Sequence, residues 1–191
     1  TRDGLQFYFS SCKNKLCRNY EKYKTDGDWT KPKVLNDYVN ELNSNSKHPN
    51  ISSQGDTLFF SSDRSSGFGG SDLWMSLRGD SSDQWLPAIN LGATINTPEE
   101  EITPFFSSHS GMLIFSSTGH VGYGGFDIFA ASGVSFFEPS IYNLGVPYNS
   151  PSDDLYFTIS DSIGFMTSNR RENNHDIFSF SVPDEELFLV T

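Results

Sequence analysis

One unit, repeated about every 53 residues, constrains this chain more than any other feature of its sequence. The anchor of the unit is a large apolar residue followed by two hydroxyl residues. It occurs at Phe9-Ser10-Ser11, Phe60-Ser61-Ser62, Phe115-Ser116-Ser117 and Met166-Thr167-Ser168, which are 51, 55 and 51 residues apart. Repetition at a fixed period of this length is typical of chains in which each repeat forms one supersecondary unit.

Two polar residues recur with nearly the same period as the anchor. An aspartate precedes an apolar-aromatic pair at Asp72, Asp127 and Asp176. An asparagine marks each connection to the next repeat, and its spacing of 53 residues places it at Asn43, Asn96 and Asn149. Asp and Asn side chains readily bond to nearby backbone groups. We therefore interpret both sets as structural, with the aspartates tying adjacent loops and the asparagines capping turns.

Within a repeat, short runs of aromatic and alternating residues are bounded by Gly, Asn, Asp and Pro, as expected for strands. The second repeat shows this best and predicts strands at residues 49–53, 57–62, 72–77 and 85–91. The longer connection between the second and third strands is rich in glycine. Four-stranded units repeated about every 40 to 50 residues are typical of propeller blades. The sequence thus predicts an all-β fold, a β-propeller of four-stranded antiparallel blades.

The 191 residues hold about 3.6 repeats of this length. We expect a partial blade at 1–42, blades at 43–95 and 96–148, a partial blade at 149–182, and a tail at 183–191 that closes the ring or links to another domain. Propellers typically have about four to eight blades. The chain is therefore expected to be part of a larger propeller, and the alternative is a four-bladed ring closed by residues 187–190.

The formal net charge of −11 excludes the electrostatic attraction that nucleic acids and anionic lipid head groups require. We expect no nucleic acid partner. No apolar run approaches the roughly 18 residues that a spanning helix needs, so no direct membrane span is expected.

The two cysteines, Cys12 and Cys17, flank four residues in a segment that reads as a hairpin. A disulfide across so short a loop would contribute about 2 kcal/mol in an oxidising compartment, and the alternative is two reduced thiols. No second Cys or His pair has the spacing of a zinc site, so no metal or other cofactor is expected from these residues.

Two kinds of residue are candidates for binding. The acidic runs Glu99-Glu100-Glu101 and Asp153-Asp154 follow the repeated asparagine at equivalent places, which predicts that they share one face. Such a face is a solvated rim, a docking surface for a basic partner, or a calcium site. Phe68 and Tyr123 lie in the glycine-rich loops, where exposed aromatics would suit partner binding, although packing between blades is the alternative.

The segments "FFSSDRSSGFGGSDLW" and "LIFSSTGHVGYGGFDIF" resemble the TolB-like, Pro-Asp-repeat (PD-type, WD-like) propellers, in the form found in envelope proteins of the Bacteroidetes. In that family the propeller usually accompanies an OmpA-like peptidoglycan-binding domain, and some members serve type IX secretion. The resemblance implies a periplasmic or outer-membrane-associated scaffold. Its partners would be envelope proteins or secretion subunits, with peptidoglycan bound through another domain of the protein.

A propeller glycosidase would need paired carboxylates facing one cavity, which the inner strands would have to supply. They read 49–52, 103–107 and 156–160 and contain no Asp or Glu. We therefore expect no enzyme, and a non-catalytic scaffold for protein–protein interaction. The alternatives are glycan or peptidoglycan binding by the propeller itself and a fragment of a propeller glycoside hydrolase.

Overall fold

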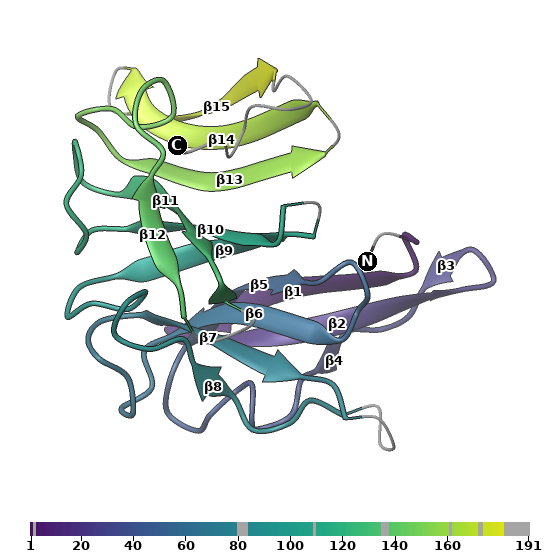
Figure 1. The fold of residues 1–191 in the computed structure, drawn as a ribbon. Helices are drawn as coiled ribbons and strands as arrows, with labels where there is room; N and C mark the ends of the chain where they lie inside the picture. Colours follow the sequence, from purple (N-terminus) through teal and green to yellow (C-terminus); the bar gives the residue numbers. More distant parts are fainter. Residues whose placement is uncertain are drawn as a thin grey trace.

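The described residues fold into four small antiparallel β-sheets, each of which is one blade of a β-propeller (Figure 1). The computed structural model describes residues 1, 3–79, 84–108, 110–134, 138–160, 162–171 and 174–181. They contain 15 strands, and the all-β propeller predicted from the repeat is confirmed. The tail 183–191 lies outside the described residues.

Each blade is contiguous in sequence. Blade 1 contains β1 (Gln6–Lys13), β2 (Leu16–Thr25), β3 (Asp28–Trp29) and β4 (Lys33–Val34). Blade 2 contains β5 (Ser46–Ile51), β6 (Thr57–Ser62), β7 (Asp72–Leu77) and β8 (Ile89–Asn90). Blade 3 contains β9 (Glu101–Ser107), β10 (Met112–Ser117), β11 (Asp127–Ser132) and β12 (Ser140–Asn143). Blade 4 contains β13 (Asp154–Ser160), β14 (Ile163–Arg171) and β15 (Asn174–Ser181).

The anchor motif shows which strands correspond between blades. Phe60 of β6 pairs in register with Trp74 of β7, and Phe9 of β1 pairs in the same way with Tyr20 of β2. Strand β1 is therefore equivalent to the second strand of blade 2, so blade 1 has no inner strand among the described residues. Blade 4 has the inner, second and third strands, and its described residues include no outer strand.

The middle strands of blades 2 and 3 are buried on both faces because each of these blades packs between two others. Strand β6 shows this alternation: Leu58 and Phe60 face blade 1 with Trp74, whereas Phe59 faces blade 3 with Leu73. A third apolar cluster lies between blades 3 and 4. Continuous apolar runs such as those of β6 and β10 are what burial on both faces requires.

The inner strands begin earlier than the sequence indicated, because each contains a bulge. At equivalent places in β5, β9 and β13, a residue other than glycine has positive φ: His48 (51°), Thr103 (54°) and Tyr156 (55°). The register shifts there, and pairing continues toward the N-terminus as far as Ser46, Glu101 and Asp154. Each such conformation costs on the order of 1 to 3 kcal/mol, so the surroundings must fix it.

Hydroxyl groups of the anchor supply part of that support. His48 Nδ1 shares a hydrogen bond of 2.9 Å with Ser61 Oγ, and Thr103 Oγ1 donates to Ser116 Oγ at 2.9 Å. The rings of His48 and Tyr156, from blades 2 and 4, lie 5.5 Å apart. The inner strands of these two blades therefore approach one another, and the anchor hydroxyls brace the bulges that face this centre.

No helix in the described part of the chain is long and apolar enough to cross a bilayer.

Candidate functional site

One side of the propeller carries both the crossovers between blades and the connections between second and third strands. We call it the crossover face. Its crossovers are residues 35–45, 91–100 and 144–153, and its connections are the hairpin turn at 14–15 and the loops 63–71 and 118–126. In Figure 1 the loops of blades 2 to 4 gather at the left of the view. The opposite side carries the turns between first and second strands.

A single amide fixes each crossover to the third strand of the blade it leaves. Asn96 Oδ1 accepts a bond from the Leu73 N–H at 2.7 Å, while its Nδ2 donates to the Leu73 carbonyl at 3.0 Å. Asn149 makes the same two bonds to Ile128, accepting from its N–H at 2.7 Å and donating to its carbonyl at 2.9 Å. The Leu73 and Ile128 carbonyls also accept the N–H groups of Leu91 and Leu144, so the amide is the partner of each buried strand N–H and a second donor to each carbonyl.

In the first crossover the equivalent amide belongs to Asn40, and the assignment to Asn43 was wrong. Asn40 Oδ1 accepts from the Asn19 N–H at 2.7 Å, and Nδ2 donates to the Asn19 carbonyl at 3.0 Å. Asn43 is exposed, in a turn with φ of 65°. Asn40 and Asn96 are 56 residues apart, because the first crossover is one residue longer between its amide and the next inner strand and blade 2 is two residues longer than blade 3, so a constant spacing of 53 residues misaligns it.

The repeated aspartates organise the glycine-rich loops. Asp72 accepts bonds from the N–H groups of Phe68 and Gly69, and Asp127 accepts from those of Tyr123 and Gly124. A Cβ at Gly67 would lie 2.6 Å from the Asp72 carboxylate, so the turn needs glycine there. Asp176 has the equivalent register opposite Ser168, yet it is exposed, with no described blade beyond it.

The acidic runs lie at equivalent places in two crossovers of the crossover face, but they do not form one exposed acidic surface. Glu99 is exposed, Glu100 is half-buried and accepts a bond from the Ser71 N–H at 3.1 Å, and Glu101 is fully buried. Because successive residues entering a strand point in different directions, neighbouring carboxylates separate. Asp153 corresponds to Glu100 and accepts from the Phe126 N–H at 3.0 Å, whereas Asp154 is buried.

The two buried carboxylates are saturated by local donors. Glu101 accepts bonds from the N–H and hydroxyl of Thr97, both at 2.7 Å, and from the Ser117 hydroxyl at 2.6 Å. Asp154 accepts from the N–H and hydroxyl of Ser150 and forms an ion pair with Arg170. The interpretation of these runs as a calcium site or one acidic docking surface therefore loses the carboxylates on which it depended.

In each crossover, a side chain of the blade that follows bonds to backbone carbonyls. This side chain is an arginine in blades 2 and 4 and a histidine in blade 3. Arg64 donates to the carbonyls of Tyr38 and Val39 at 3.2 and 2.8 Å and lies over the rings of Phe60 and Trp74. Burial lowers the pKa of the Arg64 guanidinium from its ordinary value, and the carboxylates of Glu41 and Asp63 oppose that shift. Arg170 repeats this pattern in blade 4.

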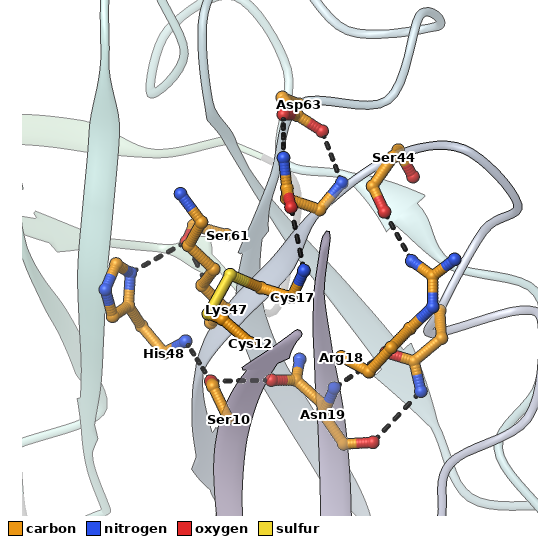
Figure 2. Close-up of a disulfide and its surroundings, with 12 residues drawn as sticks. Ser10, Cys12, Cys17, Arg18, Asn19, Ser44, Lys47, His48, Ser61 and Asp63 are labelled. Carbon is orange, nitrogen blue, oxygen red and sulfur yellow. Dashed lines mark hydrogen bonds between the residues drawn. A yellow bond between two sulfur atoms is a disulfide. The ribbon is translucent and has the colours of Figure 1, made fainter. Parts of the chain in front are cut away.

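Blade 1 replaces the glycine-rich loop with a disulfide-bonded hairpin (Figure 2). Cys12 and Cys17 pair across β1 and β2 and form the disulfide that the sequence suggested. The Cys17 N–H donates to Asn45 Oδ1 at 2.8 Å, and Asn45 in turn bonds to Asp63 of blade 2 at 2.6 and 2.7 Å. The hairpin is thus linked through one crossover residue to the next blade, as the glycine-rich loops are.

The crossover face exposes six apolar side chains, between 52% and 95% accessible, which we call the apolar tips. They are Tyr38, Leu42, Phe68, Val121, Tyr123 and Val146. The sequence singled out Phe68 and Tyr123, and the structure places both in solvent rather than between blades. It did not indicate the other four. Position in a crossover was no sufficient signal for them, because Val39 and Ile95 lie in crossovers and are buried.

None of the titratable groups with a shifted pKa is itself an apolar tip, although Arg64 bonds to the Tyr38 carbonyl and Tyr148 follows Val146 in the same crossover. Burial, with Lys47 adding a smaller effect, lowers the pKa of His48 to about 4. Burial, followed by the hydrogen bond to Glu21, raises the pKa of Tyr23, and burial raises those of Tyr148 and Tyr156. Because none of these groups belongs to the tips, binding there would depend on shape and apolar contact rather than on titration.

Comparisons with known proteins identify the fold and no family. No protein-family model and no curated protein matches the chain. Among solved structures, it is similar to a puromycin-hydrolyzing peptidase of Mycobacterium tuberculosis (12% identity, TM-score 0.55), covering 94% of this chain and 26% of that one. A study of two prolyl endopeptidases provides a second match (10%, 0.58; 95% and 24%). An α-L-arabinofuranosidase from Lactobacillus brevis provides a third (9%, 0.63; 96% and 72%). The chain thus spans about a quarter of the first two proteins.

These matches correct the expectation that the chain is not an enzyme, because all three similar structures are of enzymes. The argument behind that expectation was also incomplete. Strands β9 and β13 start at Glu101 and Asp154, so the inner strands do carry carboxylates, although both are buried and bonded within the blade. At identities of 9 to 12% the likeness establishes the propeller fold alone.

Proposed function

We propose that this propeller binds a protein partner through the apolar tips of its crossover face. The observation that supports the proposal is the gathering of six exposed apolar side chains on connections that are otherwise tightly fixed. Exposed aromatics on rigid loops make effective contacts, because little conformational entropy is lost when they bind.

The charge around the tips favours a partner with basic residues. Asp37, Asp63 and Glu99 are exposed on the same loops and crossovers, and the chain has a net charge of −11. Three arginines, Arg18, Arg64 and Arg170, donate to crossover carbonyls and are committed to those bonds. An apolar surface with basic residues at its rim would complement this pattern.

For the setting we propose the bacterial cell envelope, with an envelope protein or secretion-machinery subunit as the partner. Two features support it: the resemblance of the repeat to envelope propellers, and the Cys12–Cys17 disulfide, which persists in oxidising compartments such as the periplasm.

A site-specific crosslinking experiment tests the proposal. A photoreactive residue is placed at Phe68 or Tyr123 in cells that make the protein, with the exposed Leu77 of β7 as the control position. We expect one protein adduct from both tip positions and none from Leu77. In binding measurements with that adduct protein, Phe68→Asp/Tyr123→Asp should cost at least about 2 kcal/mol, roughly thirtyfold in Kd.

The same experiment separates the alternatives. Equal adducts at the tips and at Leu77 would argue against a specific surface. If the tips instead capture sugar and no protein, glycan recognition replaces protein docking.

A further inference from the structure

The two cysteines of the blade 1 disulfide differ in exposure. Cys12 is exposed, whereas Cys17 is 7% exposed and donates its N–H to Asn45. Exposed disulfides are the ones most open to thiol–disulfide exchange, because a thiolate must reach one of the two sulfur atoms. In the folded chain an attacking thiolate would therefore meet Cys12, and Cys17 would be the leaving group.

The exposure of Cys12 does not come from its place in the first blade of the chain. The residues equivalent to Cys12, three positions after the anchor phenylalanine, are Asp63 in blade 2 and Thr118 in blade 3. Both are exposed, although blades 2 and 3 each pack between two others. This position is thus open to solvent even in blades that are covered on both sides.

Opening the disulfide would leave the surrounding structure in place. Strands β1 and β2 are paired through eight residue pairs over the whole length of β1. The Cys17 N–H keeps its bond to Asn45, which is bonded in turn to Asp63 of blade 2 (Figure 2). The disulfide closes a short loop, and the entropy that such a bond contributes grows with loop length. Exchange can therefore proceed in the folded chain.

The turn beside the disulfide is basic. Lys13 and Lys15 are exposed there, and neither forms an ion pair in the part of the chain that the structure describes. Lys15 has a φ of 65°, a conformation that favours glycine, so its charge is present at a conformational cost. Residues 1–34 have eight Lys and Arg against four Asp and Glu, whereas the whole chain has 13 against 24. Blade 1 is therefore a basic region of an acidic protein.

These cations would favour exchange in two ways. A positive charge near a cysteine stabilises its thiolate, and Arg18, whose guanidinium is held by a crossover carbonyl, directly follows Cys17. Asp63, which is linked to Cys17 through two hydrogen bonds, opposes this effect. The exposed charges of Lys13 and Lys15 would also attract an anionic thiol and repel a cationic one.

We propose that Cys12 is a site of reversible modification by an anionic low-molecular-weight thiol. The thiolate sulfur bonds to Cys12 Sγ, the Cys12–Cys17 bond breaks, and its electron pair leaves with Cys17, which takes up a proton. Return attack by Cys17 releases the thiol and restores the disulfide, so the cycle consumes neither an oxidant nor a reductant. The proposal does not depend on the apolar tips.

Two small thiols of opposite charge test the proposal on the full chain. The anionic probe is 2-mercaptoethanesulfonate, and the cationic probe is cysteamine. The reaction is stopped with acid at early times, free thiols are labelled with a maleimide, and both groups are located by mass spectrometry. We expect the mixed disulfide on Cys12 and the maleimide on Cys17. Divided by thiolate concentration, the rate with the anionic thiol should be about fivefold higher than with the cationic thiol.

Charge variants provide matched controls. Lys13→Gln/Lys15→Gln should reduce the difference between the two thiols to less than about twofold. Lys22→Gln/Lys24→Gln, which removes two lysines from the far end of β2, should retain it. Salt at about 1 M should act on the unmodified chain as the first variant does, because it screens exposed charges.

Several results would overturn the proposal. They are a mixed disulfide on Cys17, a reaction that occurs only after the chain is unfolded in urea, equal rates with the two thiols, and a rate difference that survives in Lys13→Gln/Lys15→Gln. None of them bears on crosslinking at the apolar tips, and failure of that crosslinking would leave the exchange at Cys12 unaffected.

Discussion

The crossover into blade 2 and the crossover into blade 3 present the same backbone groups, yet different side chains hold them. Into blade 2, Arg64 reaches the carbonyls of Tyr38 and Val39. Into blade 3, His120 Nε2 bonds to the carbonyl of Ile95 at 2.8 Å, and its ring lies against Phe115 and Phe129. The repeat therefore preserves a bond to one carbonyl and an aromatic support, rather than a residue type.

Blades 2 and 3 also differ in the residue at the start of the inner strand, which is a carboxylate only in blade 3. At the start of the inner strand, blade 3 has Glu101, which accepts bonds from Thr97 and Ser117. Blade 2 has Ser46 there, whose hydroxyl donates to the Val39 carbonyl at 2.7 Å. A Cβ at Gly119, the position equivalent to Arg64, would lie 1.9 Å from Thr97 Oγ1. Thr97, which bonds to Glu101, thus leaves no room for a side chain at Gly119, whereas blade 4 has both charges in the ion pair of Asp154 with Arg170.

The largest expected effect comes from removing the arginine. Arg64→Ala should lower the free energy of unfolding by about 4 kcal/mol, since the carbonyls of Tyr38 and Val39 lose the bonds from the guanidinium and Phe60 and Trp74 lose a packed neighbour. His120→Ala should cost less, about 2 kcal/mol, because one carbonyl is affected. Urea denaturation followed by circular dichroism measures both.

The exposed Arg171→Ala is the matched control, with an expected change below about 0.5 kcal/mol. Equal losses for Arg64 and His120 would show that the two crossovers are equivalent in energy despite their chemistry.

Both crossovers have an asparagine that bonds to the third strand, and replacing it tests whether the two crossovers contribute equally to stability. Asn40→Ala should destabilise the protein by about 3 kcal/mol, because the buried Asn19 N–H loses its partner and the carbonyls of Asn19 and Leu35 lose the bonds from the Asn40 amide. Asn96→Ala should cost about the same. Asn43→Gly, in the same crossover, should change stability by no more than about 0.5 kcal/mol, since glycine accepts positive φ. Thermal unfolding of the three variants is the measurement, and a large loss for Asn43→Gly would restore that residue as the repeated amide.

These residues also show how far the sequence could lead. The blades were predictable because burial on both faces forces apolar runs at a fixed period, and β6 and β7 have the bounds expected from the pattern. The assignment of Asn43 failed because the first crossover and blade 2 together contain three more residues than a period of 53 allows. The burial of Glu101 could not be read either, because it depends on a bulge at Thr103 that has no distinctive sequence signal. For the apolar tips, the sequence indicated aromatic loop residues but not which connections share a face.

The smallest effect concerns the bulge after each crossover, where blade 2 has His48 and blade 3 has Thr103. The folded pKa of His48 is about 4, below its ordinary value of 6.5, because burial disfavours the charged ring. The unfolded chain therefore takes up a proton below about pH 6.5, while the folded chain stays neutral at this residue down to about pH 4. Stability should fall across that window, by on the order of 2 kcal/mol when partial exposure of the ring is considered.

Replacing His48 with threonine transfers the residue of blade 3 to blade 2, at a backbone conformation that Thr103 already adopts. His48→Thr should remove the part of the acid destabilisation between pH 6.5 and 4 that this ring causes, whereas His175→Gln, at an exposed position, should retain it. Urea midpoints measured at a series of pH values give the comparison. If the slope with pH is the same in His48→Thr as in the unmodified chain, the imidazole is not what makes the two bulges differ, and the loss of stability must come from the carboxylates that hold the crossovers.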